Sequence, residues 1–312
     1  MDQQTRRTGR AVRERSQRWR RRRGASLPSP VTTSAAPPGA SAVTVIDAES
    51  PRTRVELREL WRAREMALTL AWRDVKIRYK QSLIGISWAV IQPFMTMVVF
   101  TIIFGKFANF PNQGLPYQVF VYLGLVPWFV FASSLSQVGS CVQVNKALLT
   151  KVYFPRLILP ISGVFVPAVD FVFSFTVLVG IMLWFGVAIQ ATVFLAPLFL
   201  LLLAVTAVGF GGILATINAR YRDVPYAIPF IIQIWLYVSP VIYPTAGLPE
   251  KWQVLLAFNP ASAAITGFRW AVAGTPPPTA MELGLGVSMA LVFLIVGFRV
   301  FRSGEMRFAD TV

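Results

Sequence analysis

The strongest restriction on the fold of this chain is a long stretch without a charged side chain, from Leu83 to Phe104. A helix needs roughly 20 apolar residues to cross the hydrocarbon core of a bilayer, so this stretch predicts a membrane span, which Pro93 should kink. Five further apolar stretches have comparable lengths, at about 117–142, 157–185, 192–217, 226–243 and 283–301. Because a membrane span must satisfy its own backbone hydrogen bonds, we expect an all-α membrane protein with six transmembrane helices.

The composition supports a membrane protein and argues against several classes of enzyme. Hydrophobic residues make up 55% of the 312 residues and charged residues only 14%, which is typical of membrane chains rather than soluble ones. The chain has no histidine and a single cysteine, Cys141. A cysteine zinc cluster, an internal disulfide and Ser-His-Asp chemistry are therefore not expected, and we expect no cofactor in this chain.

The positive charge follows a membrane topology. A net charge of +16 would suggest nucleic acid as the partner of a soluble protein, but basic residues at the cytoplasmic flanks of spans explain it here. With the N-terminus inside, only Lys106, Lys251 and Arg269 of the 30 Lys and Arg residues lie outside. This distribution predicts a multi-pass membrane protein with both termini cytoplasmic and no nucleic acid partner. The Arg-rich and Pro-rich start of the chain suggests a bacterial source, so the membrane is expected to be the bacterial cytoplasmic membrane.

The chain before the first span divides into two parts. Residues 1–50 contain clustered Arg, then Pro, Ser and Ala, and few large apolar side chains, which predicts a disordered, basic cytoplasmic tail without a cleaved signal. This tail either binds anionic lipid head groups or is passive; an organellar transit peptide is the alternative. Residues 51–82 place apolar side chains at helical spacing among charges, which predicts an amphipathic helix at the membrane interface rather than an ordinary soluble helix.

The segment between the fifth and sixth spans, 244–278, is apolar but interrupted by Pro and Gly. It is too broken for a further span and predicts two short helices that dip into the membrane from the outer side. After the sixth span, residues 303–312 are predicted to form a cytoplasmic tail.

Few residues within the spans carry chemistry. Asp170 is the only ionisable residue between Arg156 and Arg220 and is expected to face the bundle interior, either as a proton-coupling acid or as a structural hydrogen-bonding group toward a partner helix or a wet cavity. The sequence GFGGI, 209–213, lacks the Lys-Ser/Thr of a phosphate-binding loop, so it predicts close helix packing. No G-x-x-x-x-G-K-[ST] motif occurs in the chain, and we expect no ATP-binding site in it.

Aromatic residues and one basic segment are candidates for contact with a substrate and a partner. Most rings in the first two spans are expected to face lipid or the membrane interface, but a minority could line a passage for sugars, with the candidates Trp88, Phe94, Trp128 and Phe129. The segment VNKALLTKVYFPR, 144–156, combines an apolar helical pattern with three positive charges on the cytoplasmic side. Such a helix needs a partner to cover it, or else lies on lipid head groups.

Six motifs occur in order along the chain: AWRDVKIRYKQSLIGISWAVIQP, LVPWFVFASSLSQ, NKALLTKVYFPRLILP, NARYRDVPYAIPF, LYVSPVIYP and NPASAAITGFRWAV. Together they resemble the transmembrane subunit of ABC-2 type exporters of polysaccharides, the group that moves O-antigen, capsule and teichoic acid polymers. The resemblance covers about Arg52 to Phe301 and implies that residues 83–302 form the six-helix ABC-2 transmembrane domain.

The resemblance also implies partners and site residues. Two copies of this chain would form a channel for a lipid-linked polysaccharide of the O-antigen, teichoic acid or galactan type, and two copies of a separate ATPase subunit would hold ATP and Mg²⁺. The coupling helix seated in the ATPase would contain Asn145, Lys146, Leu148, Leu149, Lys151, Tyr153, Phe154 and Arg156. The interfacial helix would contain Trp72, Arg73, Asp74, Arg78 and Tyr79, the second cytoplasmic loop Arg220, Arg222 and Asp223, and the outer gate Trp252, Phe258, Phe268 and Trp270.

Three other functions stay open at this point. The nearest is an ABC-2 exporter of a drug or a small lipid. A secondary transporter would need paired charges inside the membrane and usually repeated halves, and a membrane-embedded glycosyltransferase would show clustered acidic residues. Only Asp170 offers itself for a secondary transporter, and no acidic cluster of the kind expected for a glycosyltransferase or polymerase is visible in the sequence.

Overall fold

The computed structural model describes residues 63–80, 85–107, 113–149, 151, 154–221 and 223–311. These residues form helices and no β-strand, so the all-α prediction is confirmed. They belong to the unit Glu56–Val312. The predicted basic tail, 1–50, and the first part of the predicted interfacial helix, 51–62, lie outside the described residues.

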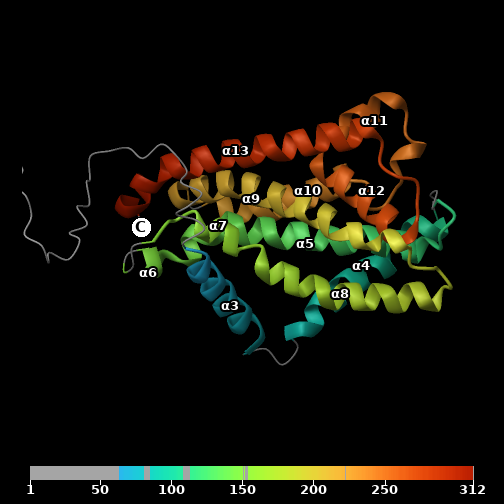
Figure 1. The fold of residues 1–312 in the computed structure, drawn as a ribbon, viewed down its shortest axis with the longest axis horizontal. Helices are drawn as coiled ribbons and strands as arrows, with labels where there is room; N and C mark the ends of the chain where they lie inside the picture. Colours follow the sequence, from blue (N-terminus) through green and yellow to red (C-terminus); the bar gives the residue numbers. More distant parts are fainter. Residues whose placement is uncertain are drawn as a thin grey trace, which may run out of the picture. The chain divides into compact units, whose positions relative to one another are not determined.

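The helices follow one another with short connections (Figure 1). The α-helices are α3 (Arg64–Lys80), α4 (Gly85–Phe100), α5 (Tyr117–Val144), α6 (Lys146–Leu149), α7 (Ile158–Ser162), α8 (Phe165–Trp184), α9 (Ala196–Arg220), α10 (Val224–Val238), α11 (Glu250–Ala257), α12 (Pro260–Ala273) and α13 (Ala280–Thr311). A π-helical segment, η1 (Thr101–Phe107), extends α4, and two 3₁₀ turns, η2 (Ala191–Leu195) and η3 (Thr245–Gly247), precede α9 and α11.

Within the part of the chain that the structure describes, five helical segments are long and apolar enough to cross a membrane: Ser87–Gly105, Tyr117–Val144, Ile158–Trp184, Ala191–Arg220 and Ala280–Gly304. Each corresponds to a span expected from the sequence. The remaining expected span, 226–243, corresponds to α10, which has 15 residues and is therefore about 22 Å long, shorter than a bilayer core of roughly 30 Å. The helix ends at Val238 because Ser239 precedes Pro240 and takes an extended conformation (φ −104°, ψ 146°), as residues before proline prefer.

Helix α5 is the centre of the bundle. It packs against α4, α8, α9, α10 and α12, and 78% of its apolar stretch is buried, against 17% for the first span. The largest side chains that it buries completely include Phe120, Tyr122 and Phe131. A helix apolar on all sides is expected inside a bundle, so α5 provides the surface on which the other helices are arranged.

Glycines bring α9 and α13 into backbone contact. A Cβ atom added to Gly297 would lie 2.0 Å from the carbonyl oxygen of Gly209, and one added to Gly211 would lie 2.7 Å from Val138 of α5. Only glycine permits such an approach, which is how small residues act at helix interfaces in membranes. The close packing predicted for GFGGI is confirmed.

Two short helices, α11 and α12, precede α13, as the Pro and Gly pattern predicted. Pro260 is the first residue of α12, the side chain of Asn259 accepts a hydrogen bond from the amide of Ala261 (3.0 Å), and Gly274 ends the helix with φ +72°. These are ordinary helix start and stop signals. Helix α12 is buried among α5, α9 and α13. Beyond the last span, α13 continues as a helix to Thr311.

Candidate functional site

Asp170 of α8 has two partners on α3, although the sequence offered no partner for it. Its Oδ2 atom forms an ion pair with Nη2 of Arg78 at 2.7 Å, and its Oδ1 atom accepts a hydrogen bond from the hydroxyl of Tyr79. Burial and the hydrogen bond to Asp170 raise the pKa of Tyr79, so the phenol stays protonated and remains a donor. Of the two roles considered for Asp170, this geometry suits the structural one, in which the carboxylate forms hydrogen bonds to a partner helix.

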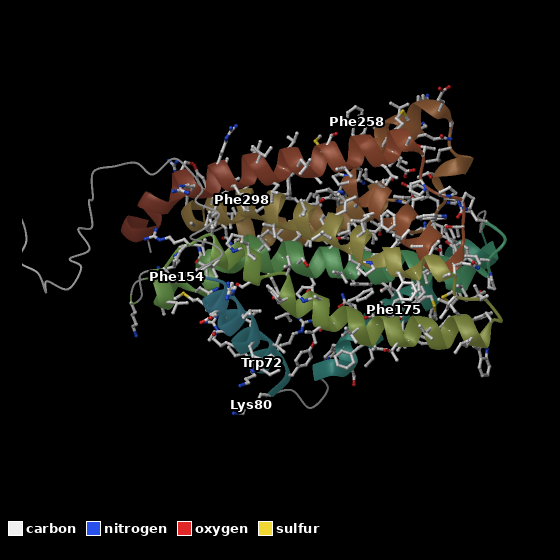
Figure 2. The ribbon with its side chains drawn as sticks, viewed as in Figure 1. Trp72, Lys80, Phe154, Phe175, Phe258 and Phe298 are labelled. Atoms are coloured by element: carbon white, nitrogen blue, oxygen red, sulfur yellow. The ribbon has the colours of Figure 1, made fainter. Side chains whose placement is uncertain are left out.

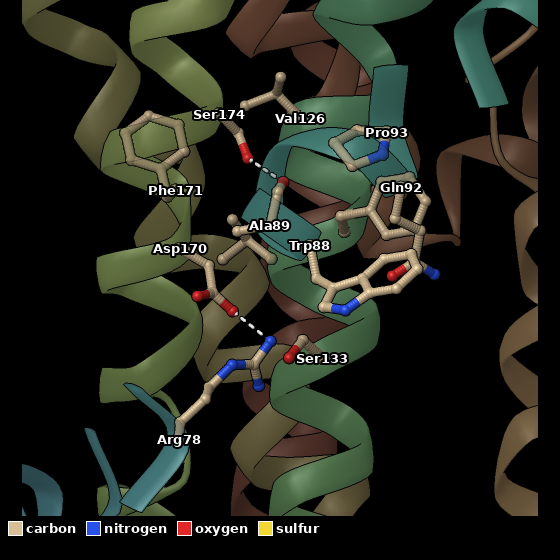
Figure 3. A pocket seen from close by; sticks show the side chains of 12 residues that line it. Arg78, Trp88, Ala89, Gln92, Pro93, Val126, Ser133, Asp170, Phe171 and Ser174 are labelled. Carbon is tan, nitrogen blue, oxygen red and sulfur yellow. Dashed lines mark hydrogen bonds and ion pairs between the residues drawn. The ribbon is translucent and has the colours of Figure 1, made fainter. Parts of the chain in front are cut away.

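A small pocket lies beside this ion pair, between the end of α3 and the helices α4, α5 and α8 (Figure 3). Its volume of about 70 Å³ has room for a few water molecules. On the far side from Arg78, Ser174 donates a hydrogen bond to the carbonyl of Ala89 in α4 (2.7 Å). The lining is mixed, with Arg78, Gln92, Ser133, Asp170 and Ser174 as polar residues and Trp88, Ala89, Pro93, Val126, Phe129, Val130 and Phe171 as apolar ones.

The four aromatic residues considered for a sugar passage lie in different places. Trp88 and Phe129 line the pocket, and Phe94 packs against the core. Trp128 is only 2% exposed and stacks near Phe131 with a ring distance of 5.5 Å. Trp128 therefore belongs to the interior of the helix bundle and is not among the residues that line the pocket.

Helix α3 makes a second polar contact, with the segment that follows α5. Nη2 of Arg73 donates to Oδ1 of Asn145 at 2.6 Å and also pairs with Oδ1 of Asp74 at 2.7 Å. Asn145 is buried and donates in turn to the carbonyl of Cys141 (2.9 Å). Trp72, by contrast, is 61% exposed (Figure 2).

The basic segment after α5 forms one helical turn, α6, and then returns to the bundle. The helix observed here is shorter than the one predicted from the sequence, because α6 ends at Leu149 and not at Pro155. Val144, Lys146 and Lys151 are exposed, while the side chains of Leu148, Leu149 and Arg156 are half-buried. Phe154 is 5% exposed and lies at the α6 end of the bundle (Figure 2). Tyr153 lies outside the described residues.

The connection between α9 and α10 lies near the end of α5. Nε2 of Gln143 donates to the carbonyl of Asn218, and Nδ2 of Asn218 donates to the carbonyl of Gly139, both at 2.9 Å. Arg220 ends α9 with its guanidinium 5.4 Å from the ring of Tyr221, and Asp223, which is exposed, precedes α10. Arg222 lies outside the described residues.

The residues expected at the outer gate are partly exposed and partly buried. Trp252 of α11 and Phe258 after it are half exposed, and Phe258 lies at the α11 end of the bundle (Figure 2). Phe268 is completely buried, with its ring 6.1 Å from that of Phe171 and 6.4 Å from that of Phe175. Trp270 packs edge-on against Phe199 at 6.4 Å.

Sequence reasoning missed the role of Arg269, which it placed outside the membrane. Arg269 is 2% exposed and donates hydrogen bonds to the backbone carbonyls of Phe120 (3.2 Å), Pro240 (2.5 Å) and Val241. Its guanidinium also lies 3.9 Å from the ring centre of Phe120. A Cβ atom on Gly124 would come within 2.4 Å of this guanidinium, so a glycine makes the room. The only sequence signal was an arginine surrounded by apolar residues.

The long apolar helices around a buried central helix define a multi-pass helical membrane protein. Residues 66–272 match the ABC-2 type transporter family, and the chain belongs to this family.

Relatives of the chain include named permeases. It is 28% identical to the O-antigen export system permease protein RfbA of Myxococcus xanthus, over 82% of this chain and 98% of the relative. It is 22% identical to the polysialic acid transport protein KpsM of Escherichia coli, over 75% of this chain and 91% of the relative. It is also 25% identical to the inner membrane transport permease YadH of E. coli, over 69% and 88%.

Proposed function

We propose that this chain is the membrane permease of an ABC exporter that moves a lipid-linked polysaccharide out of the cytoplasm. The observation that carries the proposal is the similarity to permeases named for O-antigen and polysialic acid, which this chain matches over 98% and 91% of their lengths. Near-complete coverage supports a shared role of the whole subunit and not only of a shared segment.

The energy for transport would come from a separate ATPase subunit that holds ATP and Mg²⁺, because the sequence has no phosphate-binding loop motif. The segment from Val144 to Lys151 is the candidate docking site for that subunit. Val144 is 74% exposed, and the charged Lys146 at the start of α6 and Lys151 after its end are also exposed. An exposed apolar side chain close in sequence to exposed basic ones suits a protein groove with acidic edges.

Phe154 has a different role from the exposed residues of this segment. Because it is buried, a charge at this position would destabilise the fold, and loss of ATPase binding would not then report on docking. Docking is therefore better tested at Val144 and Lys151. Two copies of this chain and two ATPase subunits complete the proposed exporter, with both termini on the cytoplasmic side.

Depletion of this chain in its host bacterium tests the substrate class. If the chain exports a lipid-linked polysaccharide, depletion lowers the polysaccharide on the cell surface while polymer accumulates inside the cell on its lipid carrier. Extraction of lipid-linked glycan and surface labelling measure the two pools. Surface polysaccharide that stays at the normal level, with no internal accumulation, would contradict the proposal and favour a drug or small lipid as the substrate.

A further inference from the structure

Polar side chains near the middle and at the C-terminal end of helix α3 attach it to the rest of the bundle. Near its middle, Arg73 contacts Asn145, the residue between α5 and α6. At its C-terminal end, Arg78 and Tyr79 contact Asp170 of α8. The two attachments are five positions apart, about 7.5 Å along the helix axis, so a rigid α3 connects the α6 segment directly to α8.

Asp170 also connects α3 to the pocket. Asp170 and Ser174 lie one helical turn apart on α8, so both point to the same side. Asp170 holds α3, Ser174 holds the carbonyl of Ala89 in α4, and both side chains line the pocket (Figure 3). A displacement of α3 would therefore be passed through Asp170 to the side of α8 that lines the pocket.

The partners of Asp170 are suited to a contact that forms and breaks. In the ion pair, the side chain of Arg78 is 38% exposed and that of Asp170 is 12% exposed. Water can therefore replace either member of the ion pair at moderate cost. A backbone-bonded charge such as Arg269 has no such alternative, since it is completely enclosed.

We propose that Asp170 is a positioning residue for the coupling between the α6 segment and the transmembrane helices. By holding the end of α3 through Arg78 and Tyr79, it makes a displacement at Asn145 reach α8 and the pocket. This inference rests on the proposed function, because the displacement at Asn145 would come from the ATPase.

Ser133, a pocket residue on α5, provides a readout of this coupling. Cys141 is the only cysteine of the chain, so Cys141→Ser together with Ser133→Cys places a single thiol in the pocket. The complex with its ATPase is reconstituted in vesicles of phosphatidylethanolamine and phosphatidylglycerol. The rate at which a cationic methanethiosulfonate modifies this thiol is measured without nucleotide and with ATP, Mg²⁺ and vanadate, together with ATP turnover.

With Asp170 present, nucleotide should change the modification rate by about tenfold, a usual size for coupling between two sites. Asp170→Asn should reduce this change to less than about twofold while ATP turnover continues, and the exchange Arg78→Asp with Asp170→Arg should restore it.

Glu282→Gln is the matched control. Glu282 is also a buried acid that accepts a hydrogen bond, from Thr266, but it belongs to α13, and its replacement should leave the change intact.

The possible failures are distinguishable. If the wild-type chain binds no ATPase, the proposed function fails, and this inference fails with it. If the ATPase binds and Asp170→Asn keeps the full nucleotide-dependent change, the inference alone is wrong and the ion pair serves only to fasten α3. Loss of ATP turnover together with loss of the change, without rescue by the charge exchange, would also overturn it, because that result indicates a general folding defect.

Discussion

Two buried charges of this protein, Arg269 and Asp170, are stabilised in opposite ways. Arg269 lies inside the packing of α5 and α12 and binds three backbone carbonyls. Asp170 lies beside a pocket and binds two side chains of another helix, one of which is partly exposed. Backbone carbonyls are fixed by the fold, whereas side chains can exchange partners with water. The contacts of Arg269 are therefore expected to stay intact, whereas those of Asp170 can break and form again.

Removal of Arg269 should have the largest effect on stability. Arg269→Ala removes three buried hydrogen bonds to backbone carbonyls and should lower the free energy of unfolding by about 3 kcal/mol or more, since a hydrogen bond to a charged group contributes about 1.5–3 kcal/mol. Thermal unfolding in detergent, followed by tryptophan fluorescence, measures the loss. Arg269→Lys retains the charge but not the planar guanidinium, so its free energy of unfolding should lie between those of the wild type and Arg269→Ala. An unfolding midpoint for Arg269→Ala close to that of the wild type would contradict the claim that the hydrogen bonds of Arg269 stabilise the packing of α5 and α12.

A glycine substitution at the contact between α9 and α13 should have the next largest effect. Gly297→Ala places a methyl group 2.0 Å from the carbonyl oxygen of Gly209, which the backbone cannot avoid, so a loss of about 1–3 kcal/mol is expected from overpacking. Gly180→Ala in α8 is the matched control, because no atom lies within 4 Å of the added Cβ. This change should instead stabilise α8 by about 0.5–1 kcal/mol. Equal effects of the two changes would show that α9 and α13 are not closely packed.

Tyr79→Phe should have the smallest effect and should depend on pH. The hydroxyl donates one hydrogen bond to Asp170, so its removal costs about 1 kcal/mol. The pKa of Tyr79 is raised above its ordinary value of 10.0, so the folded protein keeps this proton when the unfolded chain has begun to lose it. The contribution is therefore complete below pH 10 and decreases as the pH rises further.

Unfolding midpoints of wild type and Tyr79→Phe, compared from pH 7 to 11, measure this contribution. The difference should be constant up to about pH 10 and then shrink. Tyr226→Phe, which changes an exposed ring of α10, should not alter the midpoint. A difference between wild type and Tyr79→Phe that grows above pH 10 would show that the hydroxyl does not bond Asp170.

The helices were predictable because their signals are local. A span requires a long apolar stretch, and the two helices α11 and α12 are separated by Pro and Gly, so each could be recognised within a few tens of residues. The packing role of GFGGI followed from its position inside an apolar span, together with the missing Lys-Ser/Thr and the lack of a preceding strand. The end of α10 was harder, because the apolar pattern continues past Pro240 although the helix does not.

The partners of buried charges could not be predicted. Asp170 finds Arg78 and Tyr79 about ninety positions earlier in the sequence, and no local pattern encodes such a pair. Arg269 was assigned to the outside because the charge count treats every arginine as solvated, whereas this one is bonded by carbonyls of α5 and of the turn after α10. Trp128 and Phe129 are adjacent in the sequence, and only the packing of α5 decides which one reaches the pocket.

Co-purification with the ATPase encoded at the same locus tests the central claim most directly. The wild-type chain should retain the ATPase in detergent, and Val144→Glu with Lys151→Glu should reduce its recovery about tenfold or more, because both changes oppose a basic and apolar docking surface. Lys251→Glu, which reverses an exposed charge on α11, is the matched control and should retain the ATPase. The account would be contradicted if the wild-type chain retained no ATPase. It would also be contradicted if the wild type and both variants retained equal amounts of the ATPase.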